Sequence, residues 1–131
     1  TGPNMISLQD HVQYHVQEIR NTYQLETRLN TLWDALIQTM PDAQMTDILW
    51  YHGSLYFDVS LPQTSPRLRI VLSTTILAGY QIPTRQNHIA LDPDTHQVLT
   101  YFGNNEITIE HTSHTEALAC FCLHIQPWMQ T

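Results

Sequence analysis

The middle of the chain alternates between apolar and polar residues in short segments that are separated by turn signals. Alternation with a period of two is typical of β-strands that bury one face and leave the other in solvent. No helical segment interrupts the series, whereas a parallel sheet would need a crossover helix between its strands. We therefore expect an antiparallel sheet of about six short strands, at residues 47–52, 55–61, 67–73, 88–92, 97–102 and 106–110.

Helical periodicity marks the first third of the chain. Apolar residues recur there at spacings of three and four, in one stripe over residues 12–23 and a second over residues 25–40. The two stripes are out of phase near residues 21–22, which is compatible with two helices or with one bent helix. Pro41 ends the segment, because proline cannot continue a helix.

Capping signals support a helix at each end of the chain. Ser7 with Asp10 resembles a capping box for the first helix, with aspartate where glutamate or glutamine is usual. Ser113 with Glu116 forms a complete capping box for a helix near the C-terminus. Pro127 should stop that second helix.

These elements predict a single α+β domain over residues 5–131, in which N-terminal helices and one C-terminal helix pack against the antiparallel sheet. Residues 1–4 read as a remnant of cloning. The hydrophobic content of 42% is enough for a core without disulfides or a metal. Residues 79–87 read as a loop. The expected core positions are Leu68, Ile70, Leu72, Ile89, Leu91, Ile107 and Ile109 on the strands and Leu118, Phe121 and Ile125 on the last helix.

The chain is acidic and contains no lysine. Twelve Asp and Glu residues against five Arg residues give a formal net charge of −7. This charge opposes binding to nucleic acids and to anionic membranes, and it would speed the encounter with a basic protein. No apolar run approaches the roughly 18 residues of a membrane span, and no signal peptide is evident. We therefore expect a cytoplasmic protein with a protein partner, and the oligomeric state stays open.

Eight histidines raise the question of a metal site. His11 and His15 could share a helix face, but Val12 stands where the helix of a zinc protease has its glutamate. A second group near the C-terminus consists of His111, His114, Cys120, Cys122 and His124. Its two cysteines diverge around a helix instead of flanking a tight loop, as zinc ligands usually do. We therefore expect reduced cysteines, no metal and no other cofactor.

The sequence contains no recognisable catalytic motif. There is no Gly-x-Ser-x-Gly elbow and no glycine-rich loop that could hold a phosphate. Cys120 and Cys122 lie inside the predicted helix, away from its N-terminus, where a thiolate would be stabilised. The expected function is therefore non-enzymatic protein binding.

Residues 77–126 resemble the C-terminal half of domains of the SUKH superfamily. These domains combine a strand that ends in an Asp-rich turn, a second strand, a variable hairpin and a capped closing helix. His96 stands where the family commonly has glycine, and a residue with a side chain tolerates a positive φ poorly. The matching positions are Ile89, Leu91, Asp92, Thr95, Val98, Ser113, Leu118 and Phe121.

The resemblance implies an immunity protein, which neutralises a cognate bacterial toxin by binding it directly. An alternative is a type III secretion chaperone that binds a secreted effector, because those chaperones are also small, acidic α+β proteins that begin with a helix. A third reading is a small metal-dependent hydrolase that uses the histidines.

Four carboxylates are the candidate partner-binding residues. Asp92 and Asp94 lie in a turn between two predicted strands, where side chains are exposed and free to vary. Glu106 and Glu110 are separated by an even number of residues on the last predicted strand, so they share its polar face. We expect these four residues to contact a basic toxin or effector.

Overall fold

The computed structural model describes residues 8–102 and 104–130, apart from the side chains of His11, His15, Ile19 and Phe102. The described part begins with a long helix, α1 (Leu8–Thr39), and ends with a second helix, α2 (His114–Met129). Between them, seven strands form one antiparallel sheet in which every strand pairs with its neighbours in sequence. The predicted α+β class and antiparallel sheet are therefore confirmed. The strands are β1 (Gln44–Tyr51), β2 (Ser54–Ser60), β3 (Leu68–Leu72), β4 (Leu77–Gln81), β5 (Asn87–Leu91), β6 (Gln97–Phe102) and β7 (Asn105–Glu110).

Strand β4 lies where a loop was predicted. It pairs with β3 and β5, so the loop is confined to the residues between β4 and β5. Glycine and alanine weaken the sequence signal for a strand, and β4 has Ala78 and Gly79 at its centre. Gly79 gives α2 room there, since a Cβ atom would lie in a tight contact, 3.2 Å from Cζ of Phe121.

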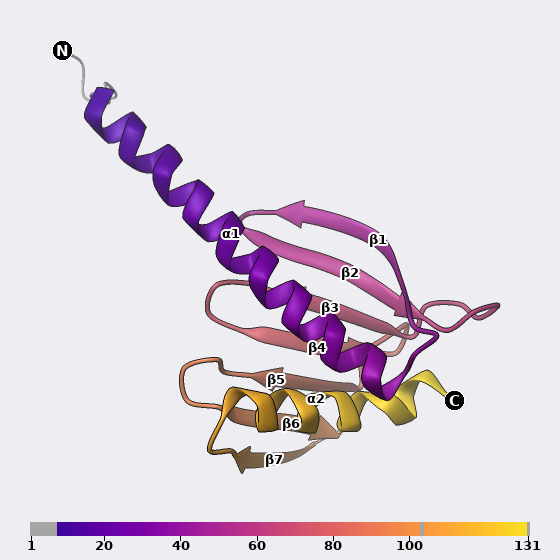
Figure 1. The fold of residues 1–131 in the computed structure, drawn as a ribbon. Helices are drawn as coiled ribbons and strands as arrows, with labels where there is room; N and C mark the ends of the chain where they lie inside the picture. Colours follow the sequence, from indigo (N-terminus) through magenta and orange to yellow (C-terminus); the bar gives the residue numbers. More distant parts are fainter. Residues whose placement is uncertain (1–7, 103, 131) are drawn as a thin grey trace.

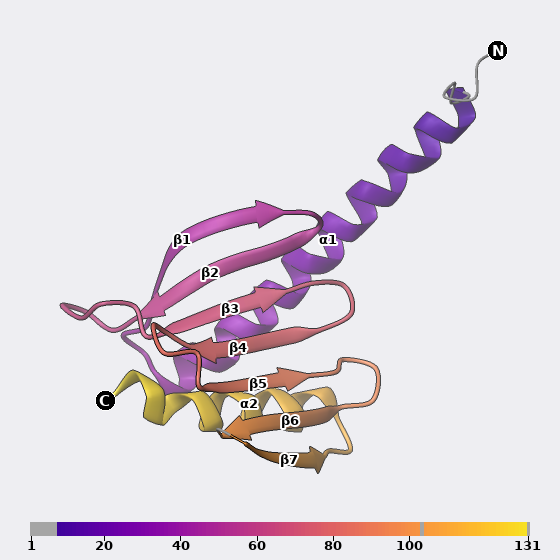
Figure 2. The same cartoon turned by 180° about the vertical axis from the view of Figure 1, so that it is seen from behind.

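Both helices cover the same face of the sheet, and the opposite face is left without a helix (Figures 1 and 2). The C-terminal half of α1 and the whole of α2 provide the apolar side chains that meet the covered face. On the strands, this core consists of alternate residues, as a period of two requires. The buried apolar strand residues are Phe57, Val59, Leu68, Ile70, Leu72, Leu77, Ile89, Leu91 and Val98.

The predicted core is confirmed for β3, β5 and α2 but is wrong for Ile107 on β7, which is 50% exposed. Ile109 is half-buried. Strand β7 is an edge strand, and α2 packs chiefly over β5 and β6, so it does not cover the end of the sheet where Ile107 lies. The alternation of residues in β7 is as predicted, but the position of the strand in the sheet leaves this face partly in solvent.

The first helix is continuous over 32 residues, so the out-of-phase stripes belong to one helix. Its N-terminal turns extend past the sheet (Figure 1). The predicted capping box of Ser7 and Asp10 is not tested, because Ser7 lies outside the described part of the chain. Helix α1 ends at Thr39, directly before Met40 and Pro41, as predicted.

Helix α2 begins as predicted but extends further than predicted. Its N-cap is Ser113, whose side chain accepts a hydrogen bond from the amide of Glu116, as the capping box predicted. The Glu116 carboxylate accepts in return from the amide and hydroxyl of Thr112. Pro127 was expected to stop the helix but lies within its last turn. A proline there removes one hydrogen bond, and burial of the following residues Trp128 and Met129 offsets that loss.

Candidate functional site

The turn between β5 and β6 contains two of the four predicted partner-binding carboxylates. Asp92 Oδ1 accepts hydrogen bonds from the amides of Asp94, at 2.8 Å, and Thr95, at 3.3 Å. The bond from Asp94 is the main reason why the pKa of Asp92 is lowered. His96 closes the turn with φ of +60°, the conformation that glycine adopts most easily. Asp92 therefore stabilises the turn, while the Asp94 side chain is exposed.

The other two carboxylates lie on β7, on the face of the sheet without helices. Glu110 accepts a hydrogen bond from Gln97 at 3.0 Å, and Glu106 pairs across the strands with Tyr101. The amide of Asp92 donates to the carbonyl of Gln97, which places the β5–β6 turn next to Glu110. Glu106 is four residues from Glu110, roughly 13 Å along the strand. The structure thus groups Asp92, Asp94 and Glu110 at one end of the sheet and places Glu106 towards the other.

The cysteines lie on α2, and both are free thiols. Burial raises the pKa of Cys122 to about 11, and burial also raises the pKa of Cys120. Cys120 Sγ lies 3.5 Å from Nδ1 of His124, so these two residues share a helix face as the sequence indicated. Raised pKa values disfavour the thiolate that a nucleophile or a zinc ligand requires.

Within residues 8–102 and 104–130, no three His, Cys, Asp or Glu side chains gather closely enough to hold a metal ion. The side chains of His11 and His15 are outside this description. The expectation that the protein needs no metal stays a prediction. None of the helices in the same described ranges has the length and apolar character needed to cross a membrane.

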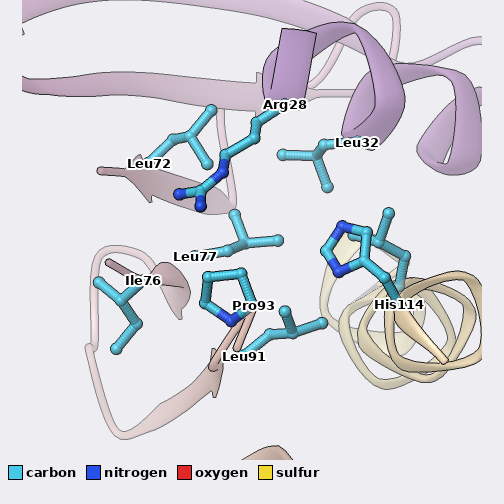
Figure 3. Close-up of a pocket in the computed structure, with 9 residues that line it drawn as sticks. Arg28, Leu32, Leu72, Ile76, Leu77, Leu91, Pro93 and His114 are labelled. Carbon is cyan, nitrogen blue, oxygen red and sulfur yellow. The ribbon is translucent and has the colours of Figure 1, made fainter. Parts of the chain in front are cut away.

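A small cavity lies between α1, α2 and the sheet (Figure 3). Its volume of about 20 Å³ has room for about one water molecule, and most of its lining is apolar. Arg28 reaches from α1 past the cavity, and its Nη1 donates to the carbonyls of Ser73, at 2.8 Å, and Thr74, at 2.6 Å. On the far side, burial lowers the pKa of His114, and the positive charges of His96 and Arg28 lower it further. The cavity is a gap in the packing where the two helices meet the sheet, and it is too small for a ligand.

Exposed apolar side chains gather on α1 and β1. Nine of the twelve large apolar side chains that are exposed in the described part of the chain lie on these two elements. A hollow of about 480 Å³ lies between them, where Tyr14 of α1 faces Trp50 of β1. The nine residues are Leu8, Val12, Tyr14, Val16 and Tyr23 on α1 and Ile48, Leu49, Trp50 and Tyr51 on β1.

Apolar residues of α1 lack cover because its N-terminal turns extend past the sheet and because the phase break turns the first stripe away from it. Tyr23 and Leu32 are nine residues apart, which places them about 180° apart around the axis at 100° per residue. The same separation relates Val16 to Leu25. Leu25 and Leu32 are each 1% exposed against the sheet, whereas Val16 is 40% and Tyr23 is 70% exposed. We call the exposed set Leu8, Val12, Val16 and Tyr23 the outer stripe of α1.

Strand β1 is the edge of the sheet beside this helix, and it is irregular. A bulge lies between Thr46 and Leu49, and Asp47 within it has φ of +53°. Bulges at sheet edges discourage another strand from pairing with the free backbone. The exposed residues that follow, Ile48 to Tyr51, are therefore suited to side-chain contacts more than to strand addition.

The uncovered face of the sheet carries polar and aromatic side chains that the sequence patterns did not group. Asp58, Arg69, Tyr80, His88 and Tyr101 come from β2 to β6, one from each strand, at directly paired positions. Arg69 binds Asp58 through two hydrogen bonds of 2.7 and 3.1 Å, and the carboxylate side chain is only 6% exposed. His88 stacks on Tyr101 with 4.1 Å between ring centroids. Sequence alternation predicts each residue's face, but it does not predict which residues pair.

Comparison with known proteins identifies no relative, because no protein-family model, no curated protein and no solved structure matches the chain.

Proposed function

We propose that the protein is a non-enzymatic binding domain that recognises a protein partner through the outer stripe of α1. The observation that carries this proposal is the exposed apolar stripe on a continuous helix whose C-terminal half buries its opposite side in the core. Exposed apolar residues that cluster in this way mark interaction surfaces, because a monomer gains nothing from leaving them in water.

The outer stripe has the spacing of a helix-packing surface. Val12, Val16, Ile19 and Tyr23 follow one another at intervals of four, three and four residues. This is the interval sequence of the a and d positions in a coiled coil, which form a narrow seam for a partner helix. The partner that fits this surface best therefore presents an apolar helix to α1.

Among protein-binding functions, immunity against a cognate bacterial toxin is the one that we favour. The resemblance of residues 77–126 to SUKH domains supports it, and the net charge of −7 suits a basic toxin better than a nucleic acid or a membrane surface. A chaperone for a secreted effector would use the same apolar surface. In both cases we propose a cytoplasmic location.

The test uses the gene next to the one that encodes this chain. If that gene encodes a toxin, the toxin is co-expressed with wild-type protein and with Val16→Asp, which places a charge in the outer stripe. The matched control is Gln24→Asp, which adds the same charge at an exposed position outside the stripe. We expect wild type and the control to restore growth and to co-purify with the toxin, and Val16→Asp to do neither while its melting temperature stays close to that of the control.

Protection by Val16→Asp equal to that of wild type would place the interface elsewhere, and the carboxylates Asp94 and Glu106 are the next candidates. Asp94→Lys and Glu106→Lys should then slow association with the toxin and reduce its salt dependence. A neighbouring gene for a secreted effector that the protein keeps soluble, without any toxicity to neutralise, would favour the chaperone instead.

A further inference from the structure

The uncovered face of the sheet is hollowed above the pair of strands β4 and β5. The hollow has a volume of about 370 Å³, which is within the range of small-molecule sites. Ala78 and Ala90 pair directly across the two strands and form its floor, because their side chains are too short to fill the space. The next pair on the same face, Tyr80 and His88, forms the rim together with Arg85.

One unpaired positive charge lies at this hollow although the protein is acidic. Arg69 and Arg85, two of the five basic residues of the chain, contact the same Tyr80 side chain. Arg69 is neutralised by its ion pair with Asp58. Arg85 is exposed, and no carboxylate in the described part of the chain lies within ion-pair distance of it. Its guanidinium carbon lies 5.4 Å from the centroid of the Tyr80 ring, which holds the charge at the rim.

The backbone and the neighbouring rings keep the rim in place. Arg85 has φ of +56°, a conformation that a residue with a side chain adopts at a cost, and its amide donates to the carbonyl of Gln81 at 2.8 Å. Tyr101, on β6, supports His88 from the side away from the hollow, with the two rings 20° from parallel. The hollow thus combines an unpaired cation, a flat imidazole and an apolar floor.

We propose that this hollow binds a small planar anion of the aromatic carboxylate class. The Arg85 guanidinium can donate two parallel hydrogen bonds to the two oxygens of a carboxylate. Hydrogen bonds between charged groups of this kind are stronger than those between neutral groups. The flat ring of the ligand lies over Ala78 and Ala90 and against the edge formed by His88. The site is on the opposite face of the sheet from the helices, so it is independent of the outer stripe of α1 and of the proposed partner.

The probe is sodium benzoate, titrated into ¹⁵N-labelled protein and followed by the amide NMR signals. Sodium acetate provides the charge without the ring, and benzamide provides the ring without the charge. We expect benzoate to shift the signals of Tyr80, Arg85, His88 and Ala90 in a saturable way. Acetate and benzamide should each bind at least about tenfold more weakly, since each lacks one of the two interactions.

Three variants locate the interaction. Arg85→Gln should weaken benzoate binding by about tenfold or more, whereas Arg20→Gln removes the same charge on α1 and should leave binding unchanged. Ala90→Leu fills the floor and should also abolish the shifts, and melting temperatures of all variants show that the fold is retained. The proposal is overturned if benzoate causes no saturable shifts, if acetate or benzamide binds as well as benzoate, or if Arg85→Gln binds as well as wild type.

Discussion

Replacing Gly79 with alanine would test how closely α2 packs against the sheet. The added Cβ atom would lie 3.2 Å from Cζ of Phe121 and 3.4 Å from the Cδ1 atoms of Leu68 and Ile70. These three neighbours are fully buried, so none of them can move into solvent. The φ angle of Gly79 lies outside the left-handed region, so the alanine backbone itself is not strained. The effect should therefore come from packing alone.

The size of the effect follows from two opposing contributions. Overpacking a tight core costs about 1–3 kcal/mol. Alanine also restricts the unfolded chain more than glycine does, which returns about 0.4–1 kcal/mol. We expect a net loss of about 1–2 kcal/mol in the free energy of unfolding, which corresponds to a melting temperature lower by about 3–8 °C. Urea unfolding followed by tryptophan fluorescence would measure it.

A second variant identifies the contact that is responsible. Phe121→Leu has no atom at the Cζ position, and alone it should be destabilising because it leaves a cavity. The double variant of Gly79→Ala and Phe121→Leu should lose less stability than the sum of the two single variants, because the clash is gone. An unchanged stability of Gly79→Ala, or strictly additive losses in the double variant, would refute the packing that we describe between β4 and α2.

Three further predictions concern α2. The pKa of His114 is lowered by burial and by the charges of His96 and Arg28, so the unfolded state binds a proton more readily. Stability should therefore be full above about pH 6.5 and fall as the pH decreases below it, and urea midpoints should show a weaker fall in His114→Gln. Burial raises the pKa of Cys122 to about 11, so its thiol should react with Ellman's reagent far more slowly in the native protein than in urea. Ser113→Ala removes the N-cap of α2 and should cost about 1 kcal/mol, which Ser113→Asp should largely avoid in a thermal unfolding series.

The sequence by itself determined the elements that depend on local chemistry. Strands β2, β3, β5, β6 and β7 follow from alternation, because successive side chains of an extended backbone point to opposite faces. The N-cap of α2 follows from Ser113 and Glu116, since the donors and acceptors of a helix end are satisfied within a few residues. The face that each carboxylate of β7 occupies was also predictable, as Glu106 and Glu110 share the uncovered face.

The tertiary structure decided which faces are covered and which residues meet. Ile107 alternates like a core residue but lies on an edge strand, and Gly79 reads as part of a loop but occupies a strand against Phe121. The two stripes of α1 are visible in the sequence, yet only the position of the sheet determines that the second is buried and the first is exposed. The hollow beside Arg85 likewise depends on strand register. Register and coverage arise from contacts between distant segments, so local periodicity does not encode them.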